Sequence, residues 1–114
     1  MLRKGSNMFV DVQSALDELG LDKEDFDEFV QELKSFTDEE VPKLRGVVEG
    51  RDYTEIRAQA HALKGALANL RFIEAAEFAK KIESAGRESL GEGLEELLDG
   101  LEKSLVASYN EIGV

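Results

Sequence analysis

The chain has no cysteine, no tryptophan, one proline and one histidine among its 114 residues. Without cysteine it can form neither a disulfide framework nor a thiolate metal site. One histidine cannot build a His-rich zinc site, and no spacing of carboxylates supports a site for a harder cation. We therefore expect no bound metal and no cofactor. The scarcity of proline, with 42 % hydrophobic and 34 % charged residues, is typical of a soluble helical protein.

Basic residues are also scarce, with 14 lysines and arginines against 25 acidic residues and a formal net charge of −11. Binding to nucleic acid or to an anionic membrane surface needs clustered positive charge, so neither is expected as a partner. No apolar run approaches the roughly 18 residues that a membrane span requires. The start of the chain, Met1–Gly5, lacks the apolar core of a signal peptide. We expect a cytoplasmic monomer.

Apolar residues recur at helical spacing along the chain, and no segment shows the sustained alternation of a strand. The pattern predicts a short first helix that is capped near Ser6-Asn7, contains Phe9 and ends at Gly20. The second helix is predicted to begin after Asp22, a good N-cap residue. Its apolar stripe comprises Phe26, Phe29, Val30, Leu33, Phe36, Val41, Leu44, Val47 and Val48.

Pro42 interrupts this second helix, and it predicts a bend because proline removes a backbone hydrogen bond and crowds the preceding turn. The continuous stripe favours one long helix up to Gly50. Residues 37–40 also resemble a capping box, so two helices remain an alternative.

Three further helices complete the expected fold. Asp52 and Glu55 predict the start of a helix that extends to about Leu70. The next helix is expected to end at Gly86, and the last to begin near Leu90 or Gly91. Short connections favour antiparallel neighbours. The sequence thus predicts an all-α fold, an antiparallel up-down four-helix bundle with a short additional N-terminal helix. It would span residues 8–114, after a flexible segment of residues 1–7 that need not be native.

The single histidine lies in the run AHALKGALANL, residues 60–70. On a helix His61 falls off the apolar stripe, toward solvent, and Lys64 lies one turn further on the same side. The stripe itself comprises Ile56, Ala60, Leu63, Leu67 and Leu70. Gly65 and neighbouring alanines remove bulk around the histidine. Since glycine inside a helix costs about 0.5–1 kcal/mol against alanine, Gly65 invites a functional explanation.

The motif His61-x-x-Lys64-Gly65 on a bundle helix resembles that of the histidine phosphotransfer (HPt) domain. Members of this family are helical bundles that carry a phosphoryl group on one exposed histidine, between aspartates of response-regulator receiver domains. One position differs, because the family's usual Asn-Leu-Gly is Asn69-Leu70-Arg71 in this chain.

The resemblance implies a phosphorelay intermediate without its own kinase domain. His61 would be the phosphorylated residue, Lys64 would stabilise the phosphoryl oxygens, and Gly65 would leave room for a docking receiver. The partners would be receiver domains and a histidine or hybrid kinase. Magnesium is expected only at the receiver's own acidic site.

A turn centred on Phe72 would place Glu83 level with His61, where it could orient the imidazole by accepting the Nδ1 proton. The same register places Lys64 level with Lys80. An ordinary solvated glutamate remains an alternative for Glu83. The alternative function is an HPt-like adaptor that docks receivers or kinases without carrying phosphate, which Arg71 could favour. A purely structural bundle would leave the combination of His61, Lys64 and Gly65 unexplained.

Overall fold

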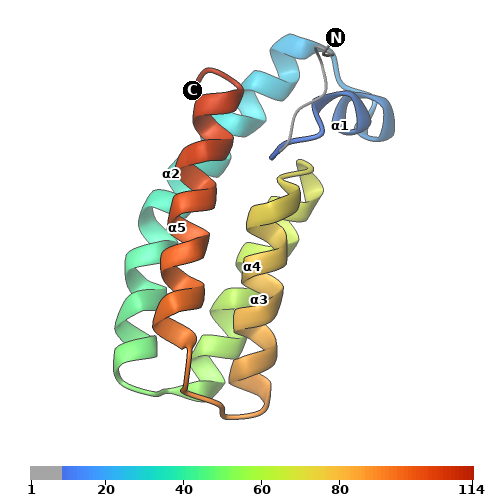
Figure 1. The fold of residues 1–114 in the computed structure, drawn as a ribbon. Helices are drawn as coiled ribbons and strands as arrows, with labels where there is room; N and C mark the ends of the chain where they lie inside the picture. Colours follow the sequence, from blue (N-terminus) through green and yellow to red (C-terminus); the bar gives the residue numbers. More distant parts are fainter. Residues whose placement is uncertain (1–8) are drawn as a thin grey trace, which may run out of the picture.

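The computed structural model describes residues 9–114, so the expectation for residues 1–7 lies outside the described part of the chain. The described helices are α1 (Val12–Leu19), α2 (Lys23–Glu49), α3 (Tyr53–Asn69), α4 (Ile73–Arg87) and α5 (Leu94–Glu111). Four long helices run alternately up and down, and α1 lies at the end where α3 turns into α4 (Figure 1). The predicted all-α bundle with an extra N-terminal helix is confirmed. Within residues 9–114 no helix is long and apolar enough to cross a membrane.

Aspartate side chains start the first three helices. Asp22 accepts a hydrogen bond from the backbone of Asp25 at 2.8 Å, and Asp52 accepts one from Glu55 at 3.3 Å, as the capping patterns predicted. The first helix differs from the prediction, because its N-cap is Asp11, which bonds to the backbone of Ser14. The predicted cap at Ser6-Asn7 lies outside the described residues.

The second helix continues unbroken through Pro42. Figure 1 shows α2 bent, with its N-terminal half leaning toward α1. The alternative capping box is not formed, because the Thr37 hydroxyl donates to the carbonyl of Lys34 instead. Thr37 is buried and lies 2.9 Å from the hydroxyl of Tyr109 on α5. Because the Thr37 hydroxyl gives its one hydrogen to Lys34, the Tyr109 hydroxyl donates to Thr37. Burial raises the pKa of Tyr109 to about 12.

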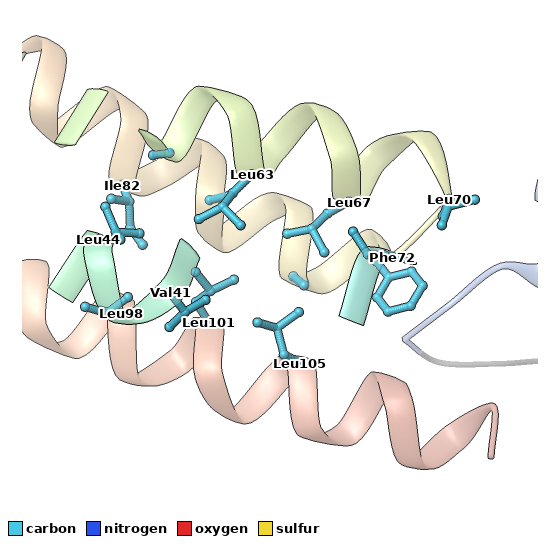
Figure 2. Close-up of a cluster of buried hydrophobic side chains, with 14 of the residues drawn as sticks. Val41, Leu44, Leu63, Leu67, Leu70, Phe72, Ile82, Leu98, Leu101 and Leu105 are labelled. Atoms are coloured by element: carbon cyan, nitrogen blue, oxygen red, sulfur yellow. The ribbon is translucent and has the colours of Figure 1, made fainter. Parts of the chain in front are cut away.

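The core lies between the four long helices, and Figure 2 shows part of it. All five residues of the predicted stripe on α3 are buried. They meet aliphatic side chains of the other long helices, including Val41, Leu44, Ile82, Leu98 and Leu101. Phe29, which the sequence placed on the apolar stripe of α2, does not belong to the core, because the residue is 45 % exposed.

Two predicted helix boundaries are displaced by glycines that serve other purposes. Helix α4 extends to Arg87, so Gly86 lies inside its final turn rather than after it. Gly86 faces α3 so closely that a β-carbon there would lie 2.8 Å from the backbone nitrogen of Arg57. Helix α5 begins at Leu94, later than expected, because the left-handed Gly93 (φ +84°) forms its N-cap. Leu90 therefore lies in the connection and is 54 % exposed.

Phe9 and Val10 lie outside α1, which corrects the prediction that Phe9 is helical. Val10 forms an antiparallel bridge with Phe72, and the backbone of Ile73 donates to the carbonyl of Phe9 at 2.9 Å. The Glu111 carboxylate accepts hydrogen bonds from the backbone of Phe9 and Val10, both at 3.1 Å. These partners come from distant parts of the chain, so local periodicity could not reveal them.

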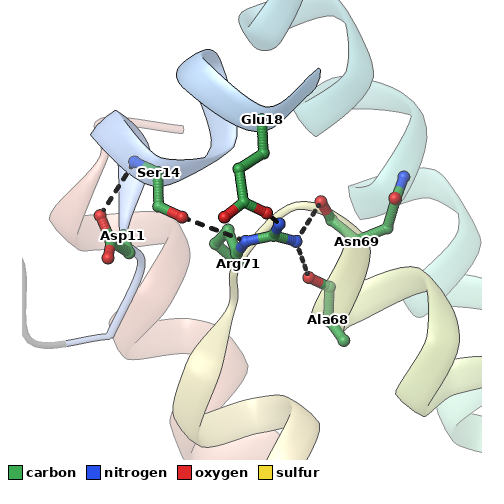
Figure 3. Close-up of polar contacts among 6 residues, drawn as sticks. All are labelled: Asp11, Ser14, Glu18, Ala68, Asn69 and Arg71. Atoms are coloured by element: carbon green, nitrogen blue, oxygen red, sulfur yellow. Dashed lines mark hydrogen bonds and ion pairs between the residues drawn. The ribbon is translucent and has the colours of Figure 1, made fainter. Parts of the chain in front are cut away.

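Arg71 joins this N-terminal part to the turn between α3 and α4. Its backbone is left-handed (φ +63°), a conformation that glycine adopts most easily. Its guanidinium donates to the carbonyls of Ala68 and Asn69 at 2.9 and 3.3 Å. It also contacts Ser14 and Glu18 of α1, and Figure 3 shows it lying between that helix and the turn.

Candidate functional site

Helix α3 presents His61 to solvent, as the sequence predicted. The imidazole-bearing side chain is 67 % exposed, while Ala60 and Leu63 beside it in sequence are buried. Four residues further on, Gly65 is exposed, and a β-carbon built there would meet no atom within 4 Å. The surface around the histidine is therefore open on the side toward the C-terminus of α3.

Glu83 of α4 contacts three charged or ionisable side chains. Although it is a glutamate, its side chain is only 6 % exposed. One carboxylate oxygen lies 2.9 Å from Nδ1 of His61, and the other lies 2.7 Å from Nζ of Lys64. Arg87, one turn further on α4, approaches the first oxygen at 3.5 Å. The buried carboxylate is thus paired on both of its oxygens, as a buried charge requires.

These contacts keep Glu83 ionised. The Lys64 ammonium is the main cause that lowers the pKa of Glu83, and the hydrogen bond with His61 lowers it further, whereas burial opposes both. An ionised carboxylate can only accept hydrogen bonds, so Nδ1 of His61 must carry the hydrogen between them. In the neutral imidazole, Nε2 is then the nitrogen with a free lone pair.

The structure brings together His61 and Glu83, which the predicted register placed at the same height. It also joins Lys64 to Glu83, a contact that the sequence interpretation missed because it placed Lys64 beside Lys80. Helical side chains lean toward the N-terminus of their helix, and this tilt was the signal that could have indicated that Lys64 reaches back toward Glu83. The direct contact of Arg87 with Glu83 was missed as well.

A shallow hollow adjoins His61 on the side toward the N-terminus of α3. It is lined by Thr54, Arg57, Ala58, His61 and Glu83. The near contact of Gly86 with the backbone of Arg57 explains why α3 and α4 lie so close at this point. Among residues 9–114, no group of three or more histidine, aspartate or glutamate side chains is arranged to hold a metal ion.

The fold and the site define a helical bundle that displays one histidine with its Nδ1 bonded to a buried carboxylate. The sequence model of the Hpt domain matches residues 28–108, from α2 to near the end of α5, and the chain belongs to this family. Hpt domains act in histidine phosphotransfer, as phosphocarriers rather than kinases, and interact with receiver and kinase domains of phosphorelays. Among curated proteins, no sequence matches the chain.

Proposed function

We propose that His61 is the phosphorylated residue and that the chain carries a phosphoryl group between aspartates of response-regulator receiver domains. The observation that supports this most directly is the bond between the exposed imidazole and the buried Glu83, 2.9 Å from Nδ1. This bond leaves Nε2 as the nucleophilic nitrogen, on a side chain that a partner can reach. The remaining chemistry would come from a receiver domain.

The transfer step requires no acid or base beyond these residues. The lone pair of Nε2 attacks the phosphorus of a receiver's phosphoaspartate, and a P–N bond forms as the P–O bond to the aspartate breaks. The electron pair of that bond stays on the aspartate carboxylate. The ring then holds hydrogen on Nδ1 and phosphorus on Nε2, and its positive charge faces the Glu83 carboxylate. Transfer to a second receiver reverses these changes. Such reactions depend mainly on positioning and charge stabilisation.

Lys64 and Gly65 complete this proposal. Lys64 is 32 % exposed, and its ammonium lies at the same carboxylate as the imidazole, so it can turn toward phosphoryl oxygens while remaining near Glu83. Gly65 leaves open space where a larger side chain would stand between His61 and a receiver. Magnesium would belong to the receiver's acidic site.

The adaptor alternative gains no support from Arg71. Its guanidinium is engaged within the chain, by the turn after α3 and by α1. Helix α3 continues for eight residues after His61, a rise of about 12 Å, before the turn that contains Arg71. The departure from the family's usual glycine therefore concerns the attachment of α1.

The test is to replace the histidine by His61→Gln and measure phosphoryl acceptance. The wild-type chain, incubated with a phosphorylated receiver domain, should gain a label that is stable in alkali and lost in acid. The variant should gain none, while helicity and melting temperature remain nearly unchanged, because surface substitutions usually stay within about 0.5 kcal/mol. Acid-labile labelling of a folded His61→Gln protein would place the phosphoryl group elsewhere and refute the proposal.

A further inference from the structure

The hollow beside His61 lies on the side of the histidine toward the N-terminus of α3. Side chains on a helix tilt toward its N-terminus, so the imidazole leans toward the turn that contains Arg57 and Ala58. Both residues line the hollow, and the Ala58 side chain is small. Because Nδ1 faces Glu83, Nε2 is at the other edge of the ring.

Arg57 differs from Lys64 and Arg87 in that no carboxylate in the described part of the chain neutralises its charge. Lys64 and Arg87 both contact the Glu83 carboxylate, at 2.7 and 3.5 Å. Arg57 is exposed, and among residues 9–114 it makes no ion pair or side-chain hydrogen bond. It lies one helical turn before His61, within reach of the same small ligand. Lys64 lies on the opposite side of the histidine and does not line the hollow.

The backbone of Arg57 is also held in place. The tight approach of Gly86 leaves no room for α3 to shift toward α4 here, since an added β-carbon would lie 2.8 Å from the Arg57 nitrogen and 3.1 Å from its α-carbon. The guanidinium therefore projects from a fixed point beside the hollow. Its planar set of donors suits two oxygens of one phosphoryl group, which a lysine cannot bind in this way.

We infer that Arg57 binds the phosphoryl group of phosphorylated His61 in this hollow, opposite Lys64. The inference rests on the proposed phosphorylation of His61 and adds a second phosphate-binding residue outside the His-x-x-Lys-Gly motif. The Lys64 ammonium would contact both Glu83 and the phosphoryl group, whereas the Arg57 guanidinium would bind the phosphoryl group alone.

The test uses phosphoramidate, a small donor that needs no protein partner, and ³¹P NMR of the labelled full chain. The second ionisation of the phosphoryl group is followed by pH titration in wild type, Arg57→Gln and Lys103→Gln. The control removes an equal charge from an exposed position on α5, outside the hollow. Arg57→Gln should raise the phosphoryl pKa by about half a unit, the effect of one water-screened charge about 5 Å away. Lys103→Gln should leave it unchanged.

The possible failures are distinguishable. If wild type is phosphorylated on His61 and the two variants titrate alike, the function stands and the role of Arg57 is refuted. If the wild-type spectrum shows no phosphohistidine with either phosphoramidate or a phosphorylated receiver, the proposed function fails, and Arg57 loses its ligand. In Arg57→Lys the phosphoryl pKa should lie between the values of wild type and Arg57→Gln, because lysine returns the charge without the paired donors.

Discussion

Glu83 is the residue on which the other groups of the site converge. It is almost fully buried, yet it contacts an imidazole, an ammonium and a guanidinium. The sequence could place Glu83 level with His61, because antiparallel pairing across a short turn fixes the register. It could not show the pairing with Lys64, which depends on the side-chain tilt and on how closely the two helices approach.

Removing the carboxylate should release the imidazole. In Glu83→Ala, Nδ1 of His61 loses its acceptor, so the hydrogen should no longer be confined to that nitrogen. We expect ¹⁵N NMR of the ring to show a shift toward the Nε2-protonated tautomer, with phosphoryl acceptance several-fold slower. Glu83→Gln retains an acceptor oxygen. Its tautomer balance and its rate of phosphoryl acceptance should therefore lie between those of wild type and Glu83→Ala. An unchanged tautomer balance in the alanine variant would show that Glu83 does not orient the ring.

The hairpin of α3 and α4 shows how far patterns within a helix can be interpreted. The apolar stripe of α3 and the Asp52 cap were evident from spacing alone. Gly86 was misinterpreted as a helix end, because glycine commonly follows a C-terminus. Its actual role is to allow two backbones to come together, and no pattern within one helix encodes that approach. Gly65 is the opposite case, a helix-interior glycine with open space around it.

This contrast predicts opposite effects from the same substitution. Gly86→Ala should destabilise the protein by about 1–3 kcal/mol, because the new methyl group must push apart the backbones of α3 and α4. Gly65→Ala should stabilise it by roughly 0.5–1 kcal/mol, since alanine is the better helix former and meets nothing there. Chemical denaturation of both variants gives the comparison. Equal unfolding free energies of Gly86→Ala and Gly65→Ala would mean that α3 and α4 can move apart at Gly86 without loss of stability.

At the scale of the whole molecule, the bundle could be predicted because four amphipathic segments of sufficient length must bury their apolar faces together. The position of Phe9 and Val10, before α1, could not be predicted in this way. Phe9 fits a helical spacing with Val12 and Leu16. Its backbone is instead hydrogen-bonded to Ile73 and to Glu111, which lie far along the sequence. Contacts of this kind join residues that are far apart in the sequence, so no local pattern encodes them.

The unfolding free energy of the whole chain should depend on pH through the ionisation of Glu83. The folded pKa of Glu83 is lowered, mainly by Lys64, from an ordinary value of 4.5. A depressed carboxylate pKa contributes stability above the unfolded pKa, and this contribution is lost as pH falls through the folded value. The difference in unfolding free energy between wild type and Glu83→Gln should thus be largest above about pH 4.5 and shrink below it.

Denaturant titrations at a series of pH values measure this difference. Glu77→Gln, on an exposed position of the same helix, controls for the removal of one negative charge from an acidic protein. A wild-type advantage over Glu83→Gln that stayed constant through the acid range would show that the carboxylate is not preferentially ionised in the folded chain.

The left-handed backbone of Arg71 has a consequence for how this sequence can change over generations. A side chain at φ +63° costs roughly 1–2 kcal/mol that glycine would avoid, and here the bonds to Ser14 and Glu18 offset that cost. Replacement of Glu18 alone removes one of these compensating contacts while the strain remains, whereas after a change of Arg71 to glycine there is no guanidinium for Glu18 to bind. The tolerance of one position therefore depends on the residue already present at the other, and the order of the two substitutions decides whether the intermediate carries the backbone strain.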